Sequence, residues 1–293
     1  MDPHLLRTFV AVVEHGSFSA AAQSLGYTQS AVSQHIAALE ADLGAALLSR
    51  RPVGPTEAGQ RLMEHARPLL LRLDAARADI ASLKQVKSSR LTVACVPAAM
   101  TPALADALAA VRRAAPGLVA AVRVLGRDEV VRAVVTGEAD LGLVSGAAAP
   151  SDPLPLPDAG PMATLGIAEE PLAVLLPTGH PLADRPALRL ADLADARWID
   201  APDTAVPLAR LRSAAHSDGF RAQVTYSGTD LRGLGVLVAA GHGLAALALG
   251  AADGLAGTVG VRISAPRLVH RTEIIHPRSP AGPVPALVAA LGG

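Results

Sequence analysis

The sequence predicts a multidomain α/β protein, with a helical N-terminal region, one long helix and a C-terminal region of two α/β lobes. Three patterns predict it: helical periodicity broken by short turns in residues 4–43, apolar repeats four and three apart in residues 58–83, and strands alternating with helices from Leu91 onward. With 293 residues and 51% apolar side chains, the chain is long enough for two domains and apolar enough to fill their cores.

Composition narrows the classes of function. Lys and Arg match Asp and Glu at 26 each, so no overall positive charge indicates nucleic acid, although this balance is compatible with a local basic patch. The single cysteine, Cys95, excludes an intramolecular disulfide and the usual cysteine-based zinc sites. No apolar segment of signal-peptide type opens the chain, and we expect a cytoplasmic protein without metal or cofactor. The uncharged stretch from Gly233 to Ala252 is long enough to span a bilayer, but its glycines favour a buried helix, turn and strand.

The first 43 residues predict three short helices. The first has apolar side chains at helical spacing and ends at Gly16. Ser17 can cap a second helix, Phe18–Leu25, and Thr28 can cap a third that runs to about Asp42.

The third helix has two different faces. Val32, Ile36 and Leu39 form one apolar stripe. Two helices joined by a short glycine turn, the second polar at its N-terminal end, are typical of a helix-turn-helix. An ordinary helical bundle with a solvated polar face gives the same pattern. The polar residues of this helix are Gln29, Ser30, Ser33, Gln34 and His35.

A short turn-rich segment and a long helix follow. Residues 47–55 carry adjacent Arg50 and Arg51, which suit either a hairpin wing on the DNA backbone or minor groove, or a solvated loop. Thr56 can cap a long helix, which we expect to bend at Pro68 and to end in a basic linker, Lys84 to Arg90. Its repeat indicates a coiled-coil-like seam that needs a partner: Ala58, Leu62, Ala66, Leu69, Leu73, Ala76, Ile80 and Leu83.

The C-terminal region predicts βαβ units, a parallel sheet and a cleft between two lobes, lined by strand ends and helix N-termini. A proline-rich stretch, Pro150 to Pro161, separates the two series of elements. The predicted strands are Leu91–Val96, Leu118–Leu125, Asp140–Val144, Leu172–Leu176, Arg197–Ile199, Gln223–Tyr226 and Leu244–Ala248; the predicted helices are Pro102–Arg113, Asp128–Thr136, Ala205–Ser217 and Asp230–Ala240.

Motifs of enzymes are absent from the sequence. It has no dinucleotide fingerprint, phosphate-binding loop, Gly-x-Ser-x-Gly elbow or His-Glu-x-x-His pair. A nucleophilic Cys95 in the cleft is one alternative, but a lone buried cysteine is more often an inert small apolar side chain. We therefore expect no enzyme.

Several motifs in the chain fit together with its order of elements. They are Phe9 to Ala22, Leu25, Gln29 to Ile36, Leu39-Glu40, Leu43-Gly44 and Thr56 to Gly59, then Gly137 to Val144, Gly179 to Leu182 and Val238 to Gly243. In these motifs and in its order of elements, the chain resembles the LysR-type transcriptional regulators, and the resemblance covers essentially the whole chain.

The resemblance implies a winged helix-turn-helix whose third helix enters the major groove, a dimerising linker helix and a periplasmic-binding-protein-like effector domain. It implies a homodimer or homotetramer that binds double-stranded operator DNA and a small-molecule effector, with RNA polymerase as a further partner and no membrane. Leu48 departs from the Phe usual in the family, and residues 1–90 hold ten Lys and Arg against eight Asp and Glu, so we expect modest non-specific affinity for DNA. The implied DNA-binding residues are Thr28, Gln29, Ser30, Ser33, Gln34, Arg50 and Arg51.

The resemblance also places the effector between the lobes. Helix N-termini there favour an anion, with Arg127 as its partner, whereas Asp230 favours an amine or a neutral molecule; both side chains are alternatively solvated surface charges. The implied effector residues are Ala99, Thr101, Arg127, Asp128, Ser145, Pro202, Thr204, Thr229 and Asp230.

We expect domain boundaries at 1–58 for the DNA-binding domain, 59–90 for the linker helix and hinge, and 91–293 for the effector domain. Lobe I then covers about 91–165 and 266–293, and lobe II about 166–265. The alternative function is a small-solute-binding protein whose helical appendage does not read DNA.

Overall fold

The computed structural model describes residues 1–82, 90–157, 160 and 162–292. The chain forms two compact units, an N-terminal unit, Met1–Ile80, and a C-terminal unit that contains nearly all of the remaining residues. The predicted seam residue Leu83 and most of the predicted basic linker lie outside the described residues. In the part of the chain that is described, no helix combines the length and apolar character needed to cross a bilayer.

The N-terminal unit opens with the three predicted helices, α1 (Pro3–His15), α2 (Phe18–Leu25) and α3 (Gln29–Leu43). Both predicted caps are confirmed: the Ser17 side chain accepts the N–H of Ala20, and the Thr28 side chain accepts the N–H of Ala31. Each cap satisfies one N–H that has no partner inside its helix. The sequence therefore sets both helix starts by local chemistry.

One apolar core holds these helices together. Phe9, Val12, Val32 and Leu39 are completely buried, and Ile36 is 1% exposed. Burying each such side chain contributes about 1.5–3 kcal/mol to the free energy of folding. Because the apolar stripe of α3 faces inward, its polar N-terminal half is left on the surface.

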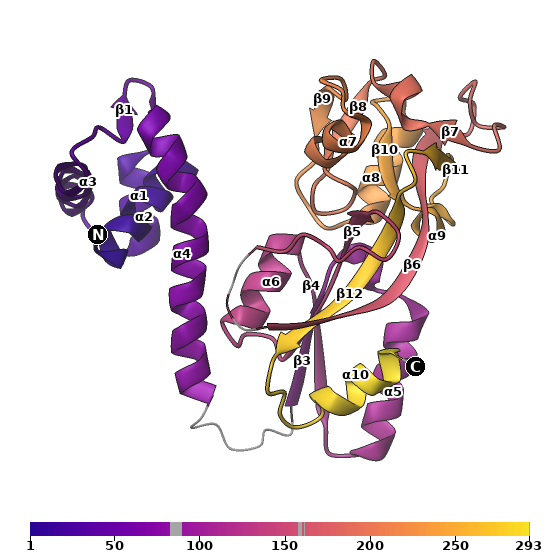
Figure 1. Cartoon of the computed structure of the whole chain (residues 1–293), viewed down its shortest axis with the longest axis horizontal. Coiled ribbons are helices and arrows are strands. Elements are labelled where there is room, and N and C mark those ends of the chain that lie inside the picture. The colour runs from indigo at the N-terminus through magenta and orange to yellow at the C-terminus, as the bar shows by residue number, and fades with distance from the viewer. Residues whose placement is uncertain (83–89, 158–159, 161, 293) are drawn as a thin grey trace. The chain divides into compact units, whose positions relative to one another are not determined.

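A hairpin and the long helix complete the unit (Figure 1). Strands β1 (Leu48–Arg50) and β2 (Val53–Pro55) pair antiparallel, and α4 follows as Glu57–Ser82. The helix is continuous through Pro68, and the bend expected there stays a prediction.

The start of α4 lies directly against the chain that enters the hairpin. Thr56 caps α4 as predicted, since its Oγ1 accepts the N–H of Gly59 at 3.1 Å. A Cβ on Gly59 would lie 2.1 Å from the carbonyl oxygen of Leu47, which no alanine could tolerate without movement of the backbone. From the other side, Glu40 Oε1 accepts the N–H groups of Leu47 at 2.8 Å and Leu48 at 3.3 Å. Helix α3, the start of the hairpin and helix α4 are thus joined at one point.

The C-terminal unit contains one long mixed sheet in the order β4-β3-β5-β12-β6-β11-β7, with β10 paired to β6, and a small parallel pair, β8 and β9. The predicted parallel sheet is correct for β3 with β4 and β5, but it is wrong for β6, β10, β11 and β12, which pair antiparallel. The strands are β3 (Arg90–Cys95), β4 (Val119–Val124), β5 (Leu141–Ala148), β6 (Met162–Pro177), β7 (Leu188–Arg189), β8 (Trp198–Asp200), β9 (Ala222–Thr225), β10 (Ala245–Ala248), β11 (Thr258–Ala265) and β12 (Val269–Pro277).

Strand β6 runs through both lobes, as Figure 1 shows. From Met162 to Pro171 it pairs with β12, and from Leu172 it pairs with β10 and β11. Pro171 is therefore the residue at which β6 changes partners. We name the β3–β4–β5–β12 side lobe I and the β10–β11 side lobe II.

Helices cover both lobes. In lobe I, α5 packs on α10, and α6 packs on β5; in lobe II, α8 and α9 pack on β6. The core of lobe II centres on Trp198, whose Nε1–H donates to the carbonyl of Leu193 at 2.9 Å. The helices are α5 (Pro102–Ala114), α6 (Arg127–Val135), α7 (Leu208–Ala215), α8 (Leu231–Ala239), α9 (Leu249–Ala252) and α10 (Val284–Gly292), with short 3₁₀ turns at Pro97–Ala99 and Leu190–Leu193.

Candidate functional site

The N-terminal half of α3 presents short polar side chains on the surface. Gln29, Ser30 and Gln34 are exposed and Ser33 is half-buried, while Thr28 caps the helix. Amide side chains can bind adenine edges through two hydrogen bonds, and hydroxyls reach bases or phosphates. The first turn of α3 also carries N–H groups that attract phosphate.

His35 ties this surface to α1. Thr8 is completely buried, and its hydroxyl donates to the carbonyl of His4 at 3.0 Å. The same hydroxyl lies 3.0 Å from His35 Nδ1, so it accepts the Nδ1–H of that ring. The exposed Tyr27 ring meets the His35 ring edge to face, with centroids 5.3 Å apart. These contacts fix the orientation of the N-terminal half of α3 relative to α1.

The hairpin turn carries the predicted arginine pair. Arg51 is exposed beyond the end of β1, and the backbone of Arg50 pairs with Val53. The side chain of Arg50 lies outside the described residues. A projecting cation on a two-residue turn is the form that a DNA-binding wing takes.

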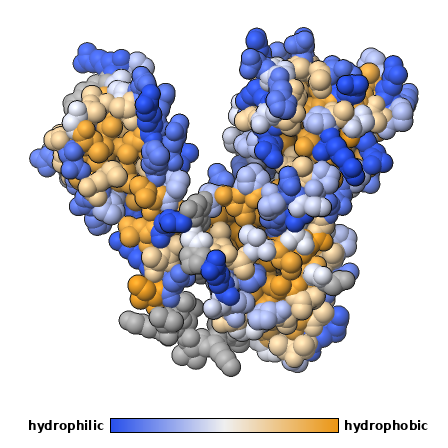
Figure 2. Space-filling model, in the orientation of Figure 1, coloured by the Kyte–Doolittle hydropathy of each residue, from blue (hydrophilic) through white to orange (hydrophobic). Residues whose placement is uncertain are grey.

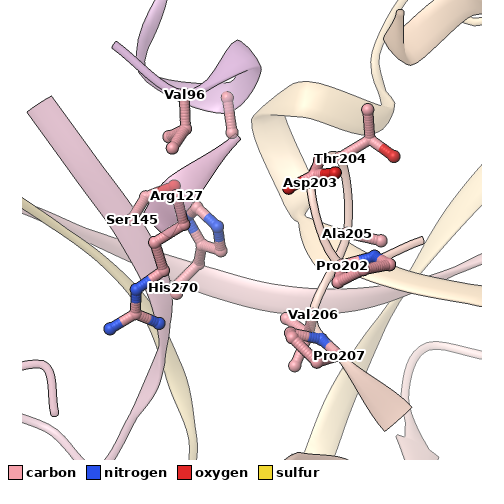
Figure 3. A pocket seen from close by; sticks show the side chains of 12 residues that line it. Val96, Arg127, Ser145, Pro202, Asp203, Thr204, Ala205, Val206, Pro207 and His270 are labelled. Atoms are coloured by element: carbon pink, nitrogen blue, oxygen red, sulfur yellow. The ribbon is translucent and has the colours of Figure 1, made fainter. Parts of the chain in front are cut away.

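A pocket lies between the lobes of the C-terminal unit, and Figure 3 shows side chains facing it from both. Lobe I contributes Arg127, at the first position of α6, with Ser145 on β5 and His270 on β12. Lobe II contributes the loop from Pro202 to Pro207, between β8 and α7. The pocket is small, with a cavity volume of about 30 Å³.

The lobe I wall carries a cation and a neutral ring. Arg127 Nη2 donates to the carbonyl of Pro155 at 2.8 Å, and among the described residues its guanidinium has no carboxylate within 4.0 Å. Burial lowers the pKa of Arg127, which nevertheless stays charged near neutral pH. His270 is 5% exposed, and burial, followed by the Arg127 charge, lowers its pKa to about 4. Its Nδ1 has no hydrogen-bond partner among the described residues.

The lobe II wall carries a carboxylate. In Figure 3 the Asp203 side chain points towards lobe I, and a Cβ on Gly126 would lie 2.2 Å from its Oδ1. Asp203 therefore touches the residue that caps α6 in the opposite lobe. Burial, followed by the negative charges of Glu129 and Asp128, raises the pKa of Asp203.

Two family descriptions match the chain, one on each part. The description "Bacterial regulatory helix-turn-helix protein, lysR family" matches residues 3–60, and "LysR substrate binding domain" matches residues 84–291. The chain belongs to the lysR family.

Curated relatives are named as regulators or activators of genes. The "Probable HTH-type transcriptional regulator LrrA" of Synechococcus elongatus is 37% identical over 180 residues, which are 60% of this chain and 58% of that protein. A "Probable hydrogen peroxide-inducible genes activator" of Mycobacterium avium is 35% identical, across 64% of this chain and 59% of that protein. "HTH-type transcriptional regulator CysL" of Bacillus subtilis is 27% identical, across 83% and 79%. The aligned part spans less than two thirds of the first two proteins.

Solved structures of lysR-family proteins share the fold. Full-length BenM has a TM-score of 0.54 at 24% identity, with 99% of this chain and 95% of that chain covered. CbnR has a TM-score of 0.52 at 24% identity, with 99% and 100% covered. The resemblance predicted from sequence motifs is confirmed, and so is the predicted fold class.

The structure brings together only some of the residues that the resemblance implies for the effector. Arg127, Ser145, Pro202 and Thr204 line the pocket. The other five do not: Ala99 is buried in the turn before α5, Thr101 precedes α5, Asp128 is exposed on α6, and Thr229 and Asp230 lie at the start of α8, where Asp230 accepts the N–H of Arg232.

Sequence reasoning missed two of the charged or polar groups of this pocket. His270 lies on β12, a strand that the sequence did not predict, so nothing placed it near Arg127. Asp203 lies within the segment Ala201 to Thr204, where ligand contacts were expected, but only Pro202 and Thr204 were singled out. The useful signal was the segment Asp200 to Thr204, polar residues at the end of a buried strand, where binding loops of α/β lobes lie.

Cys95 has the character expected of an inert side chain. It is completely buried at the end of β3, and burial raises the pKa of its thiol to about 11. A thiol that stays protonated at neutral pH is a poor nucleophile.

Proposed function

We propose that this protein is a sequence-specific DNA-binding transcriptional regulator of the LysR type, controlled by a small molecule bound between the lobes of its C-terminal unit. One observation carries the proposal: α3 buries its apolar stripe, and its capped N-terminal half exposes the hydrogen-bonding side chains of Gln29, Ser30 and Gln34. This is the end of a recognition helix that meets base edges in the major groove.

The DNA-binding surface consists of this end of α3 and the wing. Gln29 and Gln34 suit base edges, Ser30 and Ser33 suit bases or phosphates, and the first turn begun by Thr28 suits a phosphate. Arg50 and Arg51 bind the backbone or the minor groove. The lysR family supports these roles, because the residues fall on its motif.

Self-association follows from α4. Leu69 and Ile80 are 48% and 65% exposed in a single chain, and Figure 2 shows apolar side chains gathered along this helix. A second copy that packs on this seam buries them, so we infer a homodimer or homotetramer, with one recognition helix per DNA half-site. The protein acts in the cytoplasm without a catalytic step, and RNA polymerase is its further partner.

The signal that the regulator senses is a bound molecule rather than oxidation of a cysteine pair. The Mycobacterium avium relative is named as a peroxide-inducible activator, but the present chain has Cys95 alone, buried and with a raised thiol pKa. The effector pocket offers Arg127, Ser145 and Thr204, and ligand bound there shifts the balance between open and closed lobes.

Fluorescence anisotropy on the DNA upstream of the protein's own gene tests the proposal. We expect preference over a scrambled duplex and a steep fall of affinity with salt. Gln29→Ala removes a base contact and should weaken specific binding by about 1–3 kcal/mol, whereas Arg51→Ala should weaken both duplexes and reduce the salt slope.

Two exposed residues serve as matched controls, Gln60→Ala on α4 and Arg113→Ala on α5. Equal weak binding to both duplexes, unaffected by Gln29→Ala, would contradict a DNA-reading role for α3 and favour the solute-binding alternative.

A further inference from the structure

Two side chains of opposite charge line the pocket without pairing. Arg127 belongs to lobe I and Asp203 to lobe II, and no ion pair within 4.0 Å joins them or links either to another described residue. Both side chains are partly removed from water. A partly desolvated charge without a counter-ion is costly, so each favours a ligand group of the opposite sign.

A buried polar atom faces the same pocket. His270 lines it, and Nδ1 has no partner among the described residues although the side chain is 95% buried. The nearby charges are those of Arg127, with Arg210 and Glu273 near it, and that of Asp203 on lobe II, which lies near Asp128 and Glu129 of α6 in lobe I. A neutral imidazole beside a guanidinium suits one carboxylate, which can accept an N–H from each.

A ligand with one charge leaves half of this site unsatisfied. A simple carboxylate would pair with Arg127, but it would face Asp203, where Asp128 and Glu129 already concentrate negative charge. A simple amine would pair with Asp203, but it would leave the positive charge of Arg127 without a counter-ion. Arg127 and Asp203 both gain a counter-ion only when the ligand carries a carboxylate and an ammonium group.

We propose that the pocket binds a small zwitterion, an α-amino acid or a molecule with the same close pair of charges, whose carboxylate pairs with Arg127 and His270 and whose ammonium pairs with Asp203. The proposal rests on the proposed function, because it names the effector class of that same pocket. The cavity volume of about 30 Å³ is small, so the ligand should be an amino acid with a short side chain. Because the two charges belong to different lobes, such a ligand holds the lobes together.

Isothermal titration of the purified full-length protein tests the charge requirement. The probes are the twenty common amino acids singly, and for each one that binds, its analogue without the ammonium and its analogue without the carboxylate (for L-alanine, propionate and isopropylamine). We expect at least one short amino acid to bind at least tenfold more tightly than either analogue.

Four variants assign the two ends of the ligand. Arg127→Gln should weaken the amino acid at least tenfold, and Arg127→Lys should restore part of the loss. Asp203→Asn should weaken the amino acid but strengthen the analogue without ammonium, because it removes the repulsion. The matched control, Asp218→Asn, changes an exposed aspartate elsewhere in lobe II and should change neither affinity. Circular dichroism verifies that each variant is folded.

The outcomes separate this proposal from the proposed function. If no amino acid binds at millimolar concentration, if an analogue with one charge binds as tightly, or if Asp203→Asn weakens both probes equally, the zwitterion is overturned. Specific DNA binding in the anisotropy assay would then still support the regulator. If an amino acid binds as described and no DNA binding is found, the ligand class stands and the regulator is overturned.

Discussion

Gly59 offers a test in which sequence propensity and packing predict opposite signs. Alanine is favoured over glycine within a helix by about 1 kcal/mol, so Gly59→Ala in α4 should be stabilising if only helix propensity mattered. The structure predicts the reverse. A Cβ at this position would lie 2.1 Å from the carbonyl oxygen of Leu47 and 3.2 Å from Pro55 Cβ.

The magnitude follows from what must move. Leu47 O accepts the N–H of Thr56 at 2.9 Å, and the N–H of Leu47 donates to Glu40 at 2.8 Å, so displacing this residue strains both hydrogen bonds. Overpacking costs about 1–3 kcal/mol. Adding the strained hydrogen bonds and subtracting the gain in propensity leaves a net loss of about 2 kcal/mol, or about 10 °C in the midpoint of a unit of this size.

Hydrogen–deuterium exchange on a thermal series measures the two units separately, which is necessary because one midpoint does not describe a protein of two units. Gly235→Ala is the matched control, because it lies in α8 and its Cβ would meet Leu255 at an ordinary 3.4 Å. It should stabilise the C-terminal unit by about 0.5–1 kcal/mol. A midpoint of residues 1–80 that rises or stays unchanged in Gly59→Ala would refute the argument from packing.

Three further predictions concern buried polar groups. Glu40→Ala removes the acceptor for the N–H groups of Leu47 and Leu48 and should lower the stability of the N-terminal unit by about 1–3 kcal/mol, whereas Glu40→Gln keeps an acceptor oxygen. Hydrogen exchange of the two amides measures the loss of protection, and an equal loss in both variants would contradict the role of the acceptor oxygen. His270 has a pKa of about 4 in the folded protein and near 6.5 in the unfolded chain, so between these pH values protons bind preferentially to the unfolded chain. The free energy of unfolding should therefore fall by about 3 kcal/mol as pH drops from 6.5 to 4. In His270→Gln the free energy of unfolding should depend less steeply on pH across that range. Cys95 should resist iodoacetamide at pH 7.5 until the protein is denatured, as mass spectrometry can show, and rapid alkylation of the native protein would contradict its buried, protonated state.

The N-terminal half could be predicted almost element by element, because its signals are local. Ser17, Thr28 and Thr56 cap the helices that they were expected to cap, and the apolar stripe of α3 is buried as its spacing indicates. The exposed polar surface of α3 follows directly from that stripe. The role of Gly59 could not be predicted, since it depends on how closely the chain at Leu47 approaches.

The C-terminal half was less predictable because its main strands depend on tertiary context. Of β6, only Leu172–Leu176 was expected; this is its fully buried part, whereas the half that pairs with β12 is largely exposed and carries Glu169 and Glu170. β12 itself carries Arg271 and Glu273, which form an ion pair at 2.6 Å, and Glu273 is buried although its residue type does not predict burial. Missing β12 meant missing His270, and an antiparallel partner for β6 could not be derived from helix and strand order alone.

The change of partners at Pro171 has a mechanical consequence. Proline has no N–H to donate, so the ladder lacks a donor at the place where β6 leaves β12 and joins β10 and β11. The covalent strand continues through this point, which prevents the lobes from sliding past each other, yet twisting there strains fewer hydrogen bonds than elsewhere along β6. Val269, the partner of Pro171 in the ladder, is the neighbour of His270. The pocket residue His270 therefore lies next to the point where β6 changes partners, so a molecule bound to His270 would contact the strand pair at that point.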